Sequence, residues 1–260
     1  MIVDIHSHLL PGVDDGAQTL EDSIGLAKEA VKQGVSHQIL TPHHRNGRYN
    51  NYAKNVRTAT QALQSIYDQE GIPLTLHASQ EIRITSHLLD DLYAEHLLSL
   101  DDQGNYYLCE FPTQQASQEE IAILENLLDM GLTPVIAHPE RNLAFQADFS
   151  LLADLINQGC LSQVTTSCIA GIYGKELYQY AYDMIDQGLV HVLASDAHHL
   201  DWRSFHYQKA FTQLEKDFGR EKVVQFQQNA EAILRGDVVQ RDSVHLKKGK
   251  NFLKRLTKWF

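Results

Sequence analysis

The feature that most constrains this chain is the alternation of short apolar segments with amphipathic ones. Helical periodicity covers about 19–33, 53–70 and 118–130, each followed by a glycine, and Thr19 or Asp22 can cap the first helix. Seven strands that alternate with helices predict parallel β-α-β units in a single α/β domain, because no linker divides the 260 residues. The strand-like runs precede His6 and occupy residues 35–41, 73–78, 106–109, 133–137, 161–165 and 189–194.

Polar side chains follow six of the seven predicted strands at the point where each strand ends. In an extended backbone residues i and i+2 point to the same side, so His6 and His8 can face one metal ion. If the strands close into a barrel, all of these ends lie on one face, where α/β barrels place their chemistry. The convergent set is His6, His8, Asp14, His43, Glu81, Glu110, His138, Asp196 and His198.

Five imidazoles and four carboxylates exceed what one tetrahedral site uses. We therefore predict two or three divalent metal ions with bridging carboxylates. For any single position, a polar residue that only caps a strand end is the alternative. We expect His44 and His199 to support ligands or to be exposed, and the remaining histidines, His37 and His77 among them, to be structural or surface residues.

Charge and cysteine content exclude several function classes. A net charge of −11 argues against a general nucleic-acid binder, because phosphate neutralisation needs clustered Lys and Arg. Cys109, Cys160 and Cys168 lack an Arg six residues later, so cysteine-based phosphoryl chemistry is not expected. The sequence contains neither a membrane span nor a secretory signal, which predicts a cytoplasmic protein.

Six segments of the chain together resemble the polymerase-and-histidinol-phosphatase (PHP) superfamily. Within that superfamily they are most similar to the manganese-dependent protein-tyrosine phosphatases of Gram-positive capsule and exopolysaccharide operons. The resemblance runs from the N-terminus to about residue 235. The segments are Asp4-Ile5-His6-Ser7-His8, Asp14-Asp15-Gly16, Thr41-Pro42-His43-His44, Gln80-Glu81-Ile82-Arg83, His138-Pro139-Glu140-Arg141 and Ser195-Asp196-Ala197-His198.

The resemblance implies a distorted (β/α)7 TIM-like barrel over residues 1–240, followed by a basic tail over 241–260. It also implies three metal ions, most simply manganese, although Fe, Zn and Co accept the same ligands. Many relatives in the wider superfamily have His at the position of Glu110, whereas the phosphatase branch resembles this chain in having Glu there. One ion would take His6, His8, Glu81 and Asp196; the second Glu81, Glu110 and His138; the third Asp14, His43 and His198.

The residues also favour phosphomonoester hydrolysis. Divalent ions would neutralise the phosphate and provide a water of lowered pKa that attacks phosphorus. Arg141 and Arg203 have the planar fork that suits bidentate phosphate contact, and His199 could protonate the leaving phenolate. The resemblance implies a phosphotyrosine substrate on a membrane-associated bacterial tyrosine kinase of polysaccharide synthesis. A phosphatase for histidinol phosphate or sugar phosphates, and a non-catalytic metal-binding scaffold, are the alternatives.

The C-terminal segment carries a second pattern. Phe252, Leu256 and Trp259 lie on one helical face, with Leu253 and Phe260 beside them and Lys and Arg filling much of the rest. Such a segment can lie on an anionic membrane, which would place the protein at the inner face of the membrane. It can equally dock on the body of the protein or on another subunit, and both interpretations stay open.

Overall fold

The computed structural model describes residues 1–247 and contains nine strands and eleven helical segments within that range. The strands are β1 (Ile2–Asp4), β2 (Val35–Leu40), β3 (His43–His44), β4 (Thr75–Ala78), β5 (Glu81–Arg83), β6 (Tyr106–Glu110), β7 (Thr133–Ala137), β8 (Leu161–Thr165) and β9 (Val192–Ala194). The helices are α1 (Leu20–Lys32), α2 (Ala53–Gln69), α3 (Leu88–Tyr93), α4 (Gln118–Asp129), a 3-10 turn η1 (Pro139–Arg141), α5 (Leu143–Ala147), α6 (Phe149–Gln158), α7 (Thr166–Ile169), α8 (Lys175–Asp186), α9 (Tyr207–Phe218) and α10 (Arg220–Arg235).

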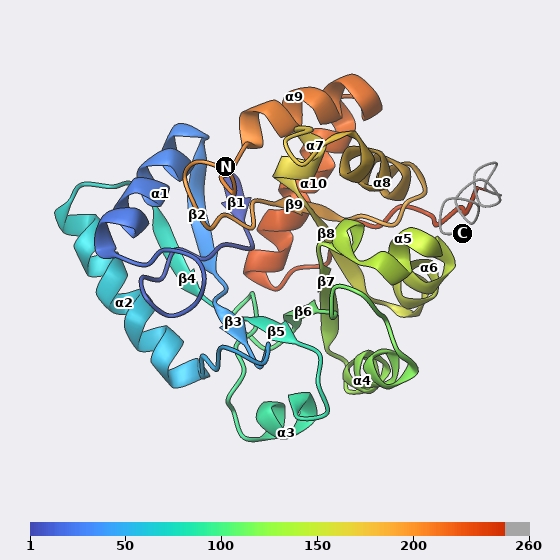
Figure 1. Ribbon diagram of the computed structural model, residues 1–260, viewed down its shortest axis with the longest axis horizontal. Helices are drawn as coiled ribbons and strands as arrows, with labels where there is room; N and C mark the ends of the chain where they lie inside the picture. Colours follow the sequence, from blue (N-terminus) through green and yellow to red (C-terminus); the bar gives the residue numbers. More distant parts are fainter. Residues whose placement is uncertain (248–260) are drawn as a thin grey trace.

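All strand pairs are parallel, as expected from the alternation of strands and helices. They form two sheets, with the orders β1-β2-β4 and β3-β5-β6-β7-β8-β9. The strands occupy the middle of the molecule and most helices lie around them (Figure 1). In the described residues, no helix is both long enough and apolar enough to cross a bilayer. The chain therefore has an α/β fold with helices packed around parallel sheets.

The division into two sheets comes from interruptions in two strands. Pro42 separates β2 from β3, and proline has no N–H to donate to a ladder. Ser79 and Gln80 separate β4 from β5. The sequence predicted β2 and β4 but missed β3 and β5, which are short and polar. Because β3 pairs with β5, His43 lies directly opposite Glu81.

Contacts beyond the ladders join the first strand to the last. An isolated parallel bridge pairs Ser7 with Ala197, and the Asp196 N–H donates to the His6 carbonyl at 2.9 Å. The carboxylate of Asp4 accepts from the N–H and the hydroxyl of Ser195. These bonds hold the ends of β1 and β9 side by side.

Side chains alternate between two packing environments along the strands. Leu108 and Val135 belong to a core cluster that contains residues from β1, β2, β6, β7, β8 and β9. Their neighbours Cys109 and Ile136 belong to a different cluster, which also contains helix residues such as Leu124. One face of the sheets therefore packs on other strands and on Ala230 and Ile233 of α10, and the opposite face packs on the surrounding helices.

Three predicted helices, α1, α2 and α4, are confirmed, and two of them begin with a capping box. Thr19 caps α1 in a capping box with Asp22, and Ser117 caps α4 with Glu120. Two strands begin later than predicted: β4 begins at Thr75 rather than at residue 73, and β9 begins at Val192 rather than at residue 189. Of the basic tail, residues 241–247 pack on the body: Arg241 donates to the Cys160 carbonyl at 3.1 Å. The predicted amphipathic face of the tail lies outside the described residues.

Candidate metal centre and phosphate cleft

Two histidines and two carboxylates meet at one point, just after the ends of β1 and β9 and at the first residue of β5. The Nε2 atoms of His6 and His8 lie 3.2 Å apart. Glu81 Oε2 lies 3.4 Å from both nitrogens, and Asp196 Oδ1 lies 3.3 and 3.4 Å from them. This is the set that the resemblance assigned to one ion, and the structure brings all four residues together.

A second group adjoins the first through Glu81. His138 Nε2 lies 2.7 Å from Glu81 Oε1 and 4.0 Å from Glu110 Oε1. His43 Nδ1 lies 2.8 Å from Glu81 Oε2. The Glu81 carboxylate thus contacts both the first group, through His6 and His8, and the second group, through His138. A carboxylate that bridges two metal ions requires this position.

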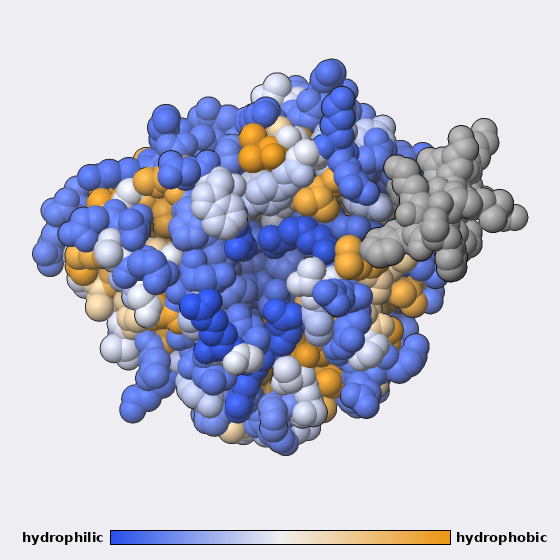
Figure 2. Space-filling model, viewed as in Figure 1, coloured by the Kyte–Doolittle hydropathy of each residue, from blue (hydrophilic) through white to orange (hydrophobic). Residues whose placement is uncertain are grey.

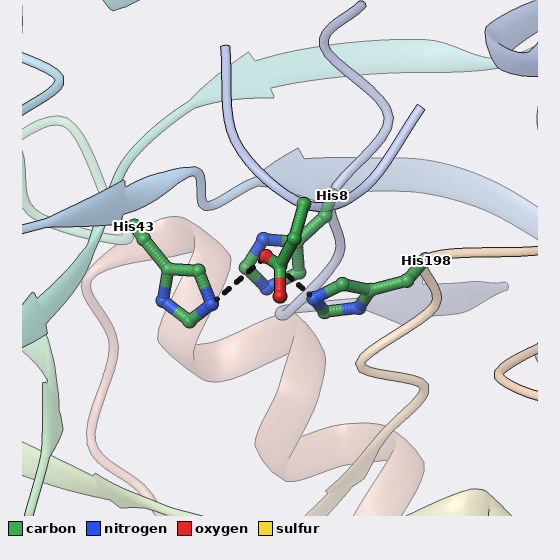
Figure 3. A group of neighbouring side chains, drawn as sticks. His8, His43 and His198 are labelled. Atoms are coloured by element: carbon green, nitrogen blue, oxygen red, sulfur yellow. Dashed lines mark ion pairs between the residues drawn. The ribbon is translucent and has the colours of Figure 1, made fainter. Parts of the chain in front are cut away.

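The third group differs from the predicted one in its carboxylate. Asp15 Oδ1 lies 3.3 Å from His43 Nε2 and 3.5 Å from His198 Nε2. Asp14 instead accepts from His8 Nδ1 at 2.6 Å and from the His43 N–H at 3.1 Å. Figure 3 shows the rings of His8, His43 and His198 gathered around one centre. The structure therefore places Asp15, rather than Asp14, between the two imidazoles.

We call these residues the strand-end cluster. It comprises His6, His8, Asp15, His43, Glu81, Glu110, His138, Asp196 and His198.

Hydrogen bonds at the outer nitrogens fix the orientation of three rings. His6 Nδ1 bonds Gln163 Oε1 at 3.0 Å, His8 Nδ1 bonds Asp14, and His198 Nδ1 bonds the Asp196 carbonyl at 2.9 Å. With Nδ1 as the donor in each case, the free lone pair is on Nε2, which faces the cluster. Histidine ligands of metal sites are oriented by outer contacts of this kind.

Several polar atoms in the cluster are buried without a hydrogen-bond partner. Among the described residues these include Asp15 Oδ1, Glu81 Oε2, Glu110 Oε2, Asp196 Oδ1 and His198 Nε2. These atoms have charged neighbours, such as Arg83 at 2.9 Å from Glu110 Oε2, but no hydrogen bond, and divalent ions would satisfy them. The donor set of imidazoles and carboxylates suits several divalent first-row metals. The residues present therefore fit a divalent metal cluster.

The electrostatics of the cluster favour cations. Burial raises the pKa of Glu110 to about 7, with the charge of Glu81 as the next cause. Burial of His138, with Arg141 close by, lowers the pKa of that ring to about 4. Burial opposes protonation of His43, but Glu81 and Asp15 outweigh it and raise its pKa to about 10. Metal ions would replace that proton and relieve the repulsion between carboxylates.

Backbone geometry also singles out two of the candidate ligands. His138 and Asp196 adopt the left-handed region, with φ of 34° and 51°, which non-glycine residues seldom occupy. At His138 the turn leads directly into η1, which carries Arg141. Strained backbone of this kind concentrates at functional sites.

A cleft of about 310 Å³ opens above the cluster. Three arginines line it together with His43, Glu110 and His138: Arg83, Arg141 and Arg203. Figure 2 shows hydrophilic residues gathered around the hollow in the middle of this face. Each of the three guanidinium groups has a buried Nε atom without a hydrogen-bond partner in the part of the chain that the structure describes. An anionic ligand in the cleft would satisfy these donors.

The two predicted arginines of the cleft share one buried carboxylate, that of Asp196. Arg141 Nη2 and Arg203 Nη2 both donate to Asp196 Oδ2, the latter at 2.8 Å. Arg83, to which the sequence analysis gave no role, pairs with Glu110 at 2.9 Å. Arg83 is the last residue of the segment Gln80-Glu81-Ile82-Arg83, and no spacing signal in the sequence points to its contact with Glu110.

Neither of the two neighbouring histidines joins the cluster. His199 stacks on Trp202, with ring centroids 5.0 Å apart, and is not part of the cleft lining given by the described residues. His44 is buried, and its Nε2 lies 3.4 Å from Asp91 Oδ2. The supporting roles expected for His44 and His199 stay predictions, and so does the role of His199 as a proton donor.

Comparisons of the sequence with a family model and with curated relatives point to one family. A family model described as "Capsular polysaccharide synthesis, CpsB/CapC" matches residues 2–235. The chain is 42% identical to tyrosine-protein phosphatase YwqE of Bacillus subtilis over 92% of this chain and 94% of YwqE. It is 32% identical to a putative tyrosine-protein phosphatase CapC of Staphylococcus aureus over 92% of this chain and 94% of CapC.

Solved structures extend the comparison. A crystal structure from work on YwqE and on CpsB of Streptococcus pneumoniae, described as unique metal-dependent tyrosine phosphatases, superposes with a TM-score of 0.92. It is 41% identical and covers 95% of this chain and 100% of that chain. A mutant organophosphorus hydrolase from Deinococcus radiodurans, 12% identical, gives a TM-score of 0.53 over 90% of this chain and 92% of its own, and that likeness concerns the fold alone.

Proposed function

Because this chain belongs to the capsular polysaccharide synthesis family CpsB/CapC, we propose that it is a metal-dependent protein-tyrosine phosphatase. The observation that carries the proposal is the position of three arginines directly above a buried cluster of imidazoles and carboxylates in one cleft. The arginines suit a phosphate dianion, and the cluster suits the ions that activate its hydrolysis.

The proposed architecture is a distorted (β/α)7 barrel with its active site at the carboxyl ends of the strands. If β2 with β3 and β4 with β5 each count as one interrupted strand, seven strand positions result. The Ser7–Ala197 bridge between the ends of β1 and β9 supports closure. The core cluster shared by residues of six strands supports it as well. In this proposal the barrel spans residues 1–240, and 241–260 are a basic tail.

The proposed cofactor is a group of two to three divalent ions, with manganese as first choice. When bound, the ions would supply Lewis acidity and a water of lowered pKa as the nucleophile. His6, His8, Glu81 and Asp196 would hold one ion. Glu81, Glu110 and His138 would hold the second, and Asp15 with His43 and His198 the third.

The proposed role of the arginines is to bind and orient the phosphate. Arg141 and Arg203 approach Asp196 from the cleft, so their remaining N–H groups lie next to the candidate ligands. Phe111 also lines the cleft, beside Glu110, and offers an apolar edge to a phenyl ring. His199 could protonate the leaving oxygen only after moving away from Trp202. Phenolate leaves readily, so a strong acid is not required.

The proposed substrate is a phosphotyrosine segment of a protein, on a membrane-associated bacterial tyrosine kinase that controls capsule or exopolysaccharide synthesis. The names of the relatives CapC and CpsB support this context. The proposed location is the cytoplasm, with the basic tail at the inner face of the membrane.

One experiment tests the activity and its metal dependence together. Chelator-treated protein is assayed on a phosphotyrosine peptide and on histidinol phosphate, before and after Mn²⁺ is restored. We expect peptide hydrolysis only with Mn²⁺, and its near-complete loss in His6→Ala. A preference for histidinol phosphate would favour the small-molecule alternative. Absence of turnover on either compound would favour the scaffold alternative, and turnover that resists chelation would refute the metal mechanism.

A further inference from the structure

Two histidines that the proposed mechanism does not use face each other on the first sheet. His37 lies on β2 and His77 on β4, and Nδ1 of His37 is 3.1 Å from Nε2 of His77. The β2–β4 register pairs His37 with Thr75 and Ile39 with His77, so both rings project from the same face of the sheet. Two paired strands hold the rings in this relation.

The pair has the geometry of two ligands of one metal ion. Bonds of about 2.0–2.1 Å from a zinc-like ion to two imidazoles place their nitrogens about 3 Å apart. The ring centroids are 5.3 Å apart in this pair and also 5.3 Å apart in His6 and His8 of the strand-end cluster. The two pairs thus share their ring separation, with an interplanar angle of 27° in His37 and His77 and of 47° in His6 and His8.

The surroundings leave the pair available to a cation. Among the described residues, each ring has the other as its only side-chain hydrogen-bond partner. Both side chains are half-buried rather than enclosed, so an ion can reach them from solvent. Glu231 on α10 faces His37, and Asp102 faces His77, whereas Arg235 and the N-terminal ammonium oppose a positive charge at His37.

Both rings are poised as neutral ligands. Burial lowers the pKa of His77 to about 4, with His37 as the next cause, and burial also lowers the pKa of His37. Neutral imidazole is the form that coordinates metals, so no proton has to be removed at pH 7.

We propose that His37 and His77 form a second metal site, separate from the strand-end cluster, for a transition ion of the Zn²⁺, Ni²⁺ or Cu²⁺ class. Two imidazoles and water complete its coordination. These metals prefer nitrogen ligands, whereas Mn²⁺ favours oxygen. The ion joins adjacent strands β2 and β4 and stabilises the folded chain by its binding.

The test is the zinc content of the full chain after equilibrium dialysis against Zn²⁺. The variants are His37→Gln and His77→Gln, which keep a polar side chain but lose one imidazole ligand. The matched control is His87→Gln, an exposed histidine just before α3. We expect wild type and His87→Gln to hold one more Zn²⁺ per chain than either test variant. Phosphatase activity with Mn²⁺ stays at the wild-type level in all of them and shows that they fold.

A spectroscopic measurement makes the outcome independent of stoichiometry. In Cu²⁺-loaded protein, electron paramagnetic resonance should show imidazole nitrogen couplings that weaken in His77→Gln and persist in His87→Gln. Equal zinc content in all four proteins would overturn the proposal. The proposal would also be overturned if His87→Gln held as little zinc as His37→Gln and His77→Gln.

Discussion

Asp14 and Asp15 are neighbours in the sequence, yet their side chains face different atoms. Asp15 Oδ1 faces the ring nitrogens of His43 and His198, while Asp14 holds the outer nitrogen of His8. A charged ligand and a carboxylate that orients a ligand have different effects when they are neutralised. Loss of a carboxylate that orients a ligand typically weakens metal affinity by about 10–100-fold without removing the site.

The two asparagine variants separate these roles. We expect Asp15→Asn to lose one ion per chain at saturating Mn²⁺, because its oxygen is part of the third group. Asp14→Asn should keep the wild-type number of ions but bind them about 10–100-fold more weakly. Metal analysis and titration of the apoprotein measure both quantities. The opposite pattern, with the ion lost in Asp14→Asn and kept in Asp15→Asn, would restore the assignment implied by the family resemblance.

Arg141 offers a test of the phosphate-binding geometry. Lysine keeps the positive charge but not the planar fork, so Arg141→Lys should lose one charge-assisted hydrogen bond to the phosphate. Such a bond is worth about 1.5–3 kcal/mol, which corresponds to about a 10–100-fold fall in kcat/KM. Arg48→Lys is the control, because Arg48 is exposed and lies over Tyr49. Equal kcat/KM in the two variants would remove Arg141 from the substrate site.

The elements that the sequence predicts well are those with strong local signals. Helix α1 has Thr19 and Asp22 at its start and Gly34, with φ of 92°, just after its end. Strands β6, β7 and β8 are fully or almost fully buried runs, so composition alone reveals them. The expectation that strand ends converge needs only parallel topology, which explains why the structure brings most of the predicted ligands together.

The elements and residues that the sequence could not predict depend on contacts distant in the chain. Strands β3 and β5 are two and three residues long with Ile82 as their one apolar residue, and they form where His43 pairs with Glu81 and where β5 pairs with β6. The choice between Asp14 and Asp15 depends on which carboxylate reaches His8, and no sequence spacing distinguishes them. The contact of Arg83 with Glu110 likewise requires two strands to be adjacent.

The loop between β1 and α1 depends on a glycine that approaches the backbone closely. A Cβ atom on Gly16 would lie 2.1 Å from the carbonyl oxygen of His8, so something must move. Gly16→Ala should therefore displace the His8 backbone, lower the free energy of unfolding by about 1–3 kcal/mol and weaken metal binding. Chemical denaturation and metal titration measure these effects.

Gly25→Ala is the matched control for this loop. Its added Cβ would meet only the end of the Leu200 side chain, and alanine favours the helix in which Gly25 lies. We expect stability equal to or above that of wild type. If Gly16→Ala behaves like Gly25→Ala, the close approach to His8 does not constrain the loop.

At the scale of the whole molecule, His191 links stability to pH. Burial, with Arg241 as the next cause, lowers its pKa to about 3 in the folded chain, against about 6.5 when unfolded. Between these values the unfolded chain binds more protons. The free energy of unfolding therefore falls as pH falls, by about 1.4 kcal/mol per pH unit from this residue. Above about pH 6.5 the residue adds no pH dependence.

His191→Asn should remove this slope. The Asn oxygen can accept the Ser162 N–H that His191 Nδ1 accepts at 3.1 Å, and it does not titrate. In metal-free protein, wild type should lose about 1–2 kcal/mol more than the variant between pH 6.5 and 5, as measured by urea unfolding. His245→Asn is the exposed control and should follow wild type. Parallel pH profiles for wild type and His191→Asn would contradict the linkage.

The Ser7–Ala197 bridge has a consequence for how the protein is made. His6 and Asp196, which meet at one candidate ion, are separated by most of the polypeptide. During translation the first histidines emerge early and must wait until Asp196 and His198 have left the ribosome. Contacts between such distant segments form late in folding. Metal capture by the complete cluster would therefore begin only after β9 and the segment that follows it have been made, and a chain arrested before β9 would lack Asp196 and His198 as ligands.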